Sequence, residues 1–244
     1  MQSPYKDDFR NFGFLSAEAD QMRASQRHDL SPKFLELQQH VMNALDVLEV
    51  TALEREDEFW WAAIGLWVRT LEACQGAIRL ADLGMASSAV SVLRTAYECL
   101  FYAAALWRKP ERLKDWKEWT EKEQRTQVKG VLKEGKSTFT SIEIENMELL
   151  LDSLTDGKKW SAYDAANDSG LLLDYQVSYR GLSLIGAHAT AVSVGCYFEK
   201  DTEGKTKATI KPDFSQFSFI CISVKKCLDI AIERLCESSK VITP

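Results

Sequence analysis

Glycine and proline are scarce in this sequence. The 244 residues include 12 glycines and 5 prolines. These two residue types interrupt regular structure more effectively than any others, so their scarcity favours long uninterrupted helices. Hydrophobic residues make up 45% of the chain and charged residues 27%, which is typical of a globular domain. A chain of this length can bury about 70% of the surface that it exposes when unfolded, so we expect a sizeable core.

Motifs of several large enzyme classes are also missing. The chain has no phosphate-binding GxxxxGK[ST] or GxGxxG loop, no HExxH zinc motif and no GxSxG nucleophile motif. It contains three histidines, none of them in the Glu-x-x-His pairs that a carboxylate-bridged di-iron bundle needs. We therefore expect neither a metal nor a cofactor, and any catalysis would have to come from the side chains themselves.

The six cysteines form no CxxC pair, and most of them lie in apolar helical contexts. This pattern favours buried, reduced thiols over a disulfide framework in a chain with a substantial core. The first residues lack the apolar run of a secretory signal, and no apolar run approaches the ~20 charge-free residues of a membrane span. These features predict a cytoplasmic protein that does not bind a membrane.

The net charge of −6 argues against general nucleic-acid binding, which usually leaves a basic surface. One stretch departs from this balance, because residues 108–136 contain ten basic and six acidic residues. We interpret this stretch as an outer helix with a solvated, ion-paired face. A surface that faces RNA or a protein partner is the alternative interpretation.

Apolar residues recur at helical spacing through most of the chain. Helix signals divide this pattern: Ser31-Pro32 is a typical start, Gly84 a typical end and Pro110 a stop. The expected helices are residues 15–27, a second from Ser31 to a break near Glu54, and then 59–83, 86–107, 111–134, 141–154, 171–198 and 214–238.

The order of these segments defines the expected fold class. Two short alternating runs on either side of a turn predict a β-hairpin near residues 197–211. The sequence as a whole predicts an all-α protein, an irregular up-down bundle of about seven helices with this one small hairpin. We expect residues 1–14 to form a flexible N-terminal arm and residues 15–244 a single helical domain.

Two of the expected helices, 86–107 and 171–198, are apolar nearly all the way round, which places them in the middle of the bundle. The first carries only two charged residues, Arg94 and Glu98, one helical turn apart. Because polar groups are rarely buried without partners, we expect the polar residues of the two helices to meet. The polar connection 156–170 could fold over them as a lid. The polar residues of the second helix are Asp174, Arg180, Ser183 and His188.

The candidate site consists of Arg94, Glu98, Arg180, Ser183 and His188. A carboxylate opposite a histidine fixes its tautomer, and an arginine stabilises phosphate or another anion. The set could therefore cleave a phosphodiester, with His188 as general acid or base, Arg180 on the phosphate and Glu98 orienting the histidine. The alternative is a structural network in which the same side chains satisfy one another across the bundle.

Two motifs in these helices resemble those of a widespread, mostly bacterial helical family of unknown function. Members of that family carry Arg-x-x-x-Glu in one helix and Tyr-x-x-x-Ser-x-x-x-x-His in a later one. The resemblance covers about residues 35–240 and implies that Arg94, Tyr179 and Ser183 bind a ligand. The matching positions in this chain are Arg94, Glu98, Tyr179, Ser183 and His188.

The arrangement also resembles, more distantly, the HEPN superfamily of all-α domains found in toxins and antiphage systems. HEPN ribonucleases carry Arg-x(4–6)-His on a late helix and cleave RNA without a metal at a dimer interface, so the resemblance also implies that the protein could form a homodimer. Here seven residues separate Arg180 from His188, and Gly181 replaces the polar neighbour of the arginine. The resemblance implies a module of bacterial defence or stress that binds a protein partner, RNA or another anion, or else a metal-independent endoribonuclease. A structural bundle that acts through its surface is the third hypothesis.

Overall fold

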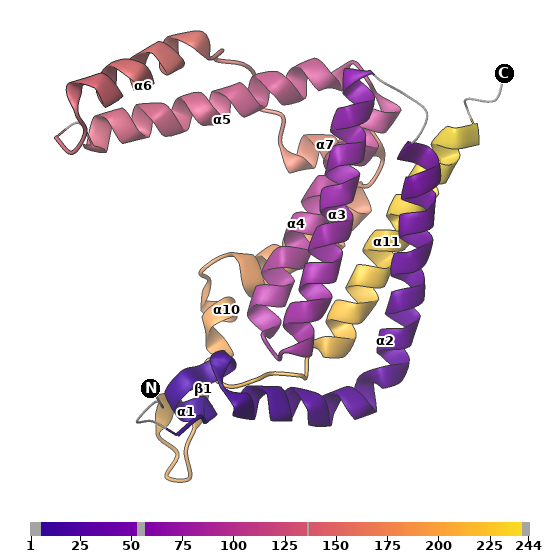
Figure 1. The fold of residues 1–244 in the computed structure, drawn as a ribbon, viewed down its shortest axis with the longest axis vertical. Coiled ribbons are helices and arrows are strands. Elements are labelled where there is room, and N and C mark those ends of the chain that lie inside the picture. Colours follow the sequence, from indigo (N-terminus) through magenta and orange to yellow (C-terminus); the bar gives the residue numbers. More distant parts are fainter. Residues whose placement is uncertain (1–5, 53–56, 136, 241–244) are drawn as a thin grey trace.

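The fold is all-α with one small hairpin, as the sequence predicts. The computed structural model describes residues 6–52, 57–135 and 137–240 (Figure 1). The longer helices are α2 (Ala17–Ala52), α3 (Glu58–Asp82), α4 (Ala86–Arg108), α5 (Arg112–Gly135), α6 (Ser141–Ser153), α7 (Ala162–Ser169) and α11 (Phe217–Lys240). The short elements are α1 (Phe9–Phe12), η1 (Gly13–Leu15), α8 (Leu172–Asp174), η2 (Tyr175–Tyr179), α9 (Arg180–Leu182), η3 (Ser183–Ala187), α10 (Ala191–Gly195), β1 (Phe198–Lys200) and β2 (Thr206–Ala208). The division into an N-terminal arm and one domain stays a prediction.

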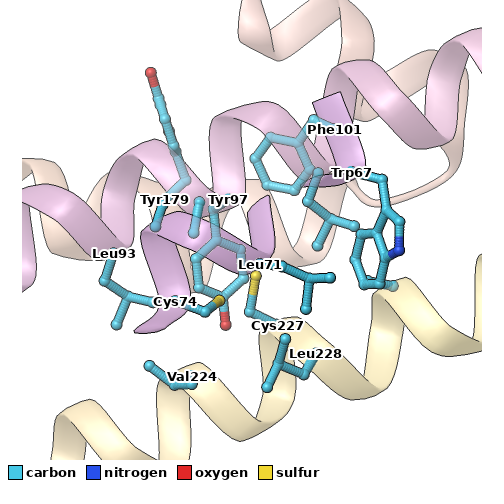
Figure 2. Close-up of a cluster of buried hydrophobic side chains, with 14 of the residues drawn as sticks. Trp67, Leu71, Cys74, Leu93, Tyr97, Phe101, Tyr179, Val224, Cys227 and Leu228 are labelled. Carbon is cyan, nitrogen blue, oxygen red and sulfur yellow. The ribbon is translucent and has the colours of Figure 1, made fainter. Parts of the chain in front are cut away.

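Helices α3 and α4 form an antiparallel pair, and α11 packs against both (Figure 1). The pair is joined by a tight turn at Gly84, whose φ is +75°. A Cβ at this position would lie 2.6 Å from the Cβ of Pro212, so the turn requires glycine. Figure 2 shows the core that the three helices enclose. It includes Trp67, Leu71 and Cys74 from α3, Leu93, Tyr97 and Phe101 from α4, and Val224, Cys227 and Leu228 from α11.

Helix α4 is the central helix of this core. Of its 23 residues, 14 are buried. By length and composition α4 could cross a membrane, but 72% of its most apolar window is buried inside the bundle. Such burial is typical of the core helix of a soluble protein. Cytoplasmic localisation stays a prediction.

The predicted helix break just before Pro32 is wrong, because α2 continues through this proline. Proline removes one backbone hydrogen bond and kinks a helix, and α2 bends sharply in Figure 1. Tertiary contacts hold both parts of the bent helix. In the first part, Arg23 Nε donates to Asp82 Oδ2 at 2.7 Å. In the second part, Leu37 is buried in the core.

Helices α5 and α6 project from the bundle as a helical hairpin (Figure 1). Neither helix has a buried residue. The Thr140 and Glu143 side chains form a capping box that starts α6, and Arg125 Nη1 donates to the Leu154 carbonyl at 2.8 Å, which ties the end of α6 to α5. The prediction that the charged stretch forms an outer helix is therefore confirmed.

The connection that we expected as a lid contains the packed helix α7. Ala165 of α7 is fully buried in the core that α4 shares. Asp168, near the end of α7, accepts from Lys109 Nζ at 2.7 Å and Arg112 Nε at 2.8 Å. Trp160 Nε1 donates to the same carboxylate at 3.2 Å. These buried contacts fix the connection in place, so the expectation of a lid is wrong.

The segment predicted as one helix over residues 171–198 is divided. It passes from α8 through the π-helical segment η2, through α9 and into a second π-helical segment, η3. His188 then has extended backbone, with φ −111° and ψ 146°. Thr190 and Ser193 form a capping box that starts α10. Because this box favours a new helix start at Thr190, the chain leaves the first helix at His188.

The inner face of this divided segment packs against α4, as predicted. A Cβ at Gly186 would lie 2.5 Å from Val90 Cγ1, and the Ser91 hydroxyl donates to the Gly186 carbonyl at 2.8 Å. The outer face lies in solvent, with Leu173 73% and Val177 62% exposed. The two apolar helices are therefore neighbours, but only α4 is central. The central position predicted for the second helix is wrong.

Strands β1 and β2 form the predicted hairpin. Phe198 pairs with Ala208, and Lys200 pairs with Thr206, in an antiparallel register. Gly204 has a φ of +79° in the turn between the strands, a conformation that glycine adopts without a steric penalty. The hairpin follows directly on α10, so it lies at the end of the divided segment.

Candidate functional site

Arg94 and Glu98 lie one turn apart on the face of α4 that meets the divided segment. Arg94 Nη1 donates to Glu98 Oε2 at 2.9 Å. The two side chains are 22% and 29% exposed, so the ion pair lies at the edge of the core. The pairing predicted from their spacing is therefore present in a half-buried position.

Tyr179 and Ser183 complete the network from the facing segment. Arg94 Nε donates to Ser183 Oγ at 2.9 Å, and Arg94 Nη2 donates to the Tyr179 hydroxyl. The Ser183 hydroxyl in turn donates to the Tyr179 carbonyl at 2.8 Å. The Tyr179 hydroxyl lies 3.4 Å from Glu98 Oε2, to which it donates. One arginine therefore joins α4 to both π-helical segments.

An aromatic cluster supports Tyr179. Its ring contacts Phe101 at a centroid distance of 5.9 Å and stacks on Tyr175 at 5.0 Å. The guanidinium carbon of Arg94 lies 4.4 Å from the centroid of the Tyr179 ring, within range of a cation–π interaction. In Figure 2 the Tyr179 hydroxyl points away from the core residues. Burial, together with the charge of Glu98, raises the pKa of Tyr179 to about 12, so its hydroxyl remains a donor at neutral pH.

Arg180 and His188 lie outside this network. Arg180 is exposed, and its Nη1 donates to Gln176 Oε1 at 3.1 Å. The His188 side chain is also exposed, while its backbone is held on both sides. Its N–H donates to the Ser183 carbonyl at 3.1 Å, and its carbonyl accepts from the Ser193 hydroxyl at 2.6 Å. A fixed backbone therefore presents the imidazole to solvent.

The network and the two exposed side chains border the same open pocket, of about 640 Å³. Arg94 contributes from α4, and Arg180 and His188 contribute from the facing segment. Tyr179 and Ser183 also line the pocket, so it brings together five of the six site residues predicted from the sequence. The sixth, Glu98, is bonded to Arg94 and is not part of the lining. Within the described residues, no group of three or more His, Cys, Asp or Glu side chains could hold a metal.

Two predicted contacts are not formed. Glu98 is bonded to Arg94 and Tyr179, and within the described chain it makes no contact that would orient His188. Asp174 pairs with Lys226 of α11 at 2.5 Å, on a different side of its helix. The arginine–carboxylate network and the imidazole are therefore separate groups that share one pocket.

Sequence reasoning missed Tyr175, Gln176 and Thr190, which also line the pocket. The first two lie four residues before Tyr179 and Arg180, so helical spacing already placed each pair on one face. Thr190 was hidden inside the predicted helix. Its signal was the capping box with Ser193, a local pattern of the kind that starts helices.

The fold and the site together define a class: an all-α bundle whose central arginine–carboxylate pair lies beside an open cationic pocket. The family DUF5677, described as a family of unknown function, matches residues 61–206. This match covers more than half of the chain and every residue of the site, so the protein belongs to this family. The expectation of an uncharacterised helical family is thereby confirmed. No curated protein and no solved structure matches the chain.

Proposed function

We propose that the protein is a HEPN-like helical module that binds a phosphate-bearing anion in the pocket between α4 and the divided segment. The observation that carries this proposal is the convergence of Arg94, Arg180 and His188 on one open pocket. Within the described residues, none of the side chains that line it is acidic. A defence or stress context follows from the HEPN resemblance and is part of the proposal.

The hydrogen-bonding capacity of the two arginines supports anion binding. An arginine side chain carries five N–H groups. Arg94 uses three of them, for Ser183, Glu98 and Tyr179, which leaves two of the five without an acceptor among the described residues. Arg180 uses one, for Gln176, and within the described chain the other four have no protein acceptor. Guanidinium N–H groups match phosphate oxygens in geometry as well as charge, so the free groups favour a phosphate-bearing ligand.

The position of Glu98 supports the same ligand. Its carboxylate accepts a hydrogen bond from Arg94 Nη1 and so fixes the orientation of the guanidinium. Since Arg94 is already held by three partners, an anion that binds to it would immobilise little additional side-chain freedom. Arg180 is exposed and makes one hydrogen bond, to Gln176. It therefore contributes positive charge to the pocket but is less firmly oriented than Arg94.

Endoribonuclease activity is the second candidate, and the exposed imidazole of His188 favours it. In this reaction His188 would remove the proton of a ribose 2′-hydroxyl, and the 2′-oxygen would attack the adjacent phosphorus. The bond to the 5′-oxygen breaks, a 2′,3′-cyclic phosphate forms, and the 5′-oxygen takes up a proton from water. Arg180 would stabilise the charge on the phosphate. Glu98 contributes through Arg94 rather than through His188.

Binding of a fluorescein-labelled single-stranded RNA, measured by fluorescence anisotropy, tests the proposal. We expect Arg180→Ala to weaken binding by roughly tenfold, because a charge-assisted bond to phosphate is lost. The slope of log affinity against log salt should fall by about 0.7, as for one phosphate contact on a single strand. The matched control is Arg69→Ala, which removes an exposed arginine of α3 outside the pocket. Equal affinities and slopes for both variants would contradict the proposal.

The same RNA, incubated with the protein in EDTA, separates the two candidates. Products with a 2′,3′-cyclic phosphate that disappear in His188→Ala, while RNA still binds, would establish the ribonuclease. Binding without cleavage would leave the protein as a binding module. Circular dichroism of each variant shows whether the helical fold is retained.

A further inference from the structure

A second pocket, of about 400 Å³, lies between the bent helix α2 and helix α3. Its apolar lining includes Phe34, Leu37 and Val41 of α2 and Ile78 of α3. Leu37 is only 4% exposed, so the floor of this pocket is continuous with the core. Pockets of this volume with mostly apolar walls are typical sites for small organic ligands. We call it the α2–α3 groove.

Two arginines give the α2–α3 groove a positive charge. Arg27 lies on α2 with its guanidinium carbon 5.0 Å from the centroid of the Phe34 ring. Arg79 projects from α3 into the same lining. No acidic side chain lines the groove within the part of the chain that the structure describes. A ligand that fits must therefore combine an apolar body with a negative group.

One buried carboxylate, Asp82, offsets only part of this charge. Asp82 is 3% exposed and is bonded to Arg23, whose Nε lies 2.7 Å from Asp82 Oδ2. Arg27 Nε lies farther away, 3.7 Å from Asp82 Oδ1, and its side chain is 45% exposed. Two arginines thus share one carboxylate, and Arg79 adds a third positive charge. Net positive charge remains at this end of the groove.

We propose that the α2–α3 groove binds a small amphipathic carboxylate, with its hydrocarbon body on Leu37 and Val41 and its carboxylate between Arg27 and Arg79. This site goes beyond the function proposed for the first pocket and does not depend on it. Met42 lies at the edge of the groove and is 53% exposed, an apolar side chain that a bound hydrocarbon would cover.

Titration of the 244-residue chain with octanoate and with 1-octanol, followed by ligand-observed NMR, tests this proposal. We expect octanoate to bind roughly tenfold more tightly than 1-octanol, because only the carboxylate can bond to the arginines. Arg79→Ala should lower the affinity for octanoate by a similar factor and leave the affinity for 1-octanol unchanged. Arg69→Ala, on the same helix but outside the groove, should change neither.

A second pair of variants tests the charge without removing an arginine. Met42→Glu places a carboxylate at the exposed edge of the groove, where it repels octanoate. We expect the affinity for octanoate to be about tenfold lower than in Met42→Gln. Because Met42 is exposed, neither change should disturb the fold. Undetectable octanoate binding, equal binding of 1-octanol, or equal affinities for the two Met42 variants would overturn the proposal.

Discussion

Two carboxylates of this protein, Asp168 and Glu98, bind the same kinds of partner in different surroundings. Each accepts hydrogen bonds from an arginine and from an aromatic side chain. Asp168 is 5% exposed and has a third donor, Lys109. Glu98 is 29% exposed and lies behind an open pocket. Each carboxylate and its donors form a cluster, which we name after Asp168 or Glu98. The two clusters contain similar donors and differ in their exposure to solvent.

This difference indicates what each cluster does. Asp168 joins the end of α7 to Lys109, between α4 and α5, and to Arg112 at the start of α5, and these donors leave little room for a ligand. Among the described residues, Glu98 pairs with one arginine, Arg94, which still has N–H groups available at the pocket. We infer that the first cluster stabilises the fold and that the second prepares an arginine for binding. Removal of each carboxylate should therefore have a different consequence.

Replacement of the more buried carboxylate should have the largest effect. Asp168→Ala leaves Lys109 and Arg112 without their shared partner, and we expect it to lower the free energy of unfolding by about 2–4 kcal/mol. Urea denaturation followed by circular dichroism measures this change. Asp152→Ala, an exposed position on α6, is the control and should change stability by less than ~0.5 kcal/mol. Similar losses for the two variants would show that Asp168 is not a structural anchor.

The close approach of η3 to α4 gives the next largest effect. Gly186→Ala places a Cβ 2.5 Å from Val90 Cγ1, and we expect a loss of about 1–3 kcal/mol in unfolding free energy. Gly181→Ala is the matched control on the same segment, because its Cβ meets no atom of the described residues within 4 Å. That variant should be neutral or slightly stabilising, since alanine favours helix more than glycine does. The comparison fails if both variants unfold at the same urea concentration.

Replacement of the half-buried carboxylate should cost less. Glu98→Ala removes one ion pair and one long hydrogen bond, so we expect a loss of about 1–2 kcal/mol by urea denaturation. The same variant should weaken anion binding if the orientation that Glu98 gives Arg94 outweighs the repulsion between the anion and the Glu98 carboxylate. Glu98→Gln keeps the size of the side chain and should lose about half as much stability. A loss as large as that of Asp168→Ala would mean that Glu98 is as structural as Asp168.

Part of this comparison could be predicted from the sequence. Arg94 and Glu98 interrupt a strongly apolar helix, and Tyr179 and Ser183 interrupt its neighbour at helical spacing, so their meeting follows from the cost of burying polar groups. Asp168 was not predicted. Its two cationic donors, Arg112 and Lys109, lie 56 and 59 residues earlier in the chain, and no local pattern relates them to Asp168.

The pocket could not be predicted because it depends on where a helix ends. The periodicity of apolar residues continues through His188, and the sequence therefore predicts one helix to residue 198. The capping box at Thr190 interrupts it in the structure and exposes the imidazole. The opposite error occurs in α2, where a start signal at Pro32 is overridden by packing on both sides of the bend. Local signals compete with tertiary contacts, and the sequence alone does not rank them.

The smallest expected effect is a change in how the unfolding free energy depends on pH when Tyr179 is replaced. Burial raises its pKa to about 12 in the folded protein, above the ordinary value of 10.0. Between these values the unfolded chain loses the phenolic proton and the folded protein keeps it, so stability falls as the pH rises from about 10 to 12. Tyr179→Phe removes this proton, and its unfolding free energy should fall less steeply with pH than that of the wild type.

Burial also raises the pKa of Tyr97 and Tyr102, so some pH dependence of stability should remain in the variant. Urea denaturation at pH 8, 10 and 11 measures how the unfolding free energy of each protein changes with pH. Equal pH dependence in the wild type and the variant would mean that solvent reaches the Tyr179 hydroxyl freely, despite its hydrogen bonds with Arg94 and Glu98.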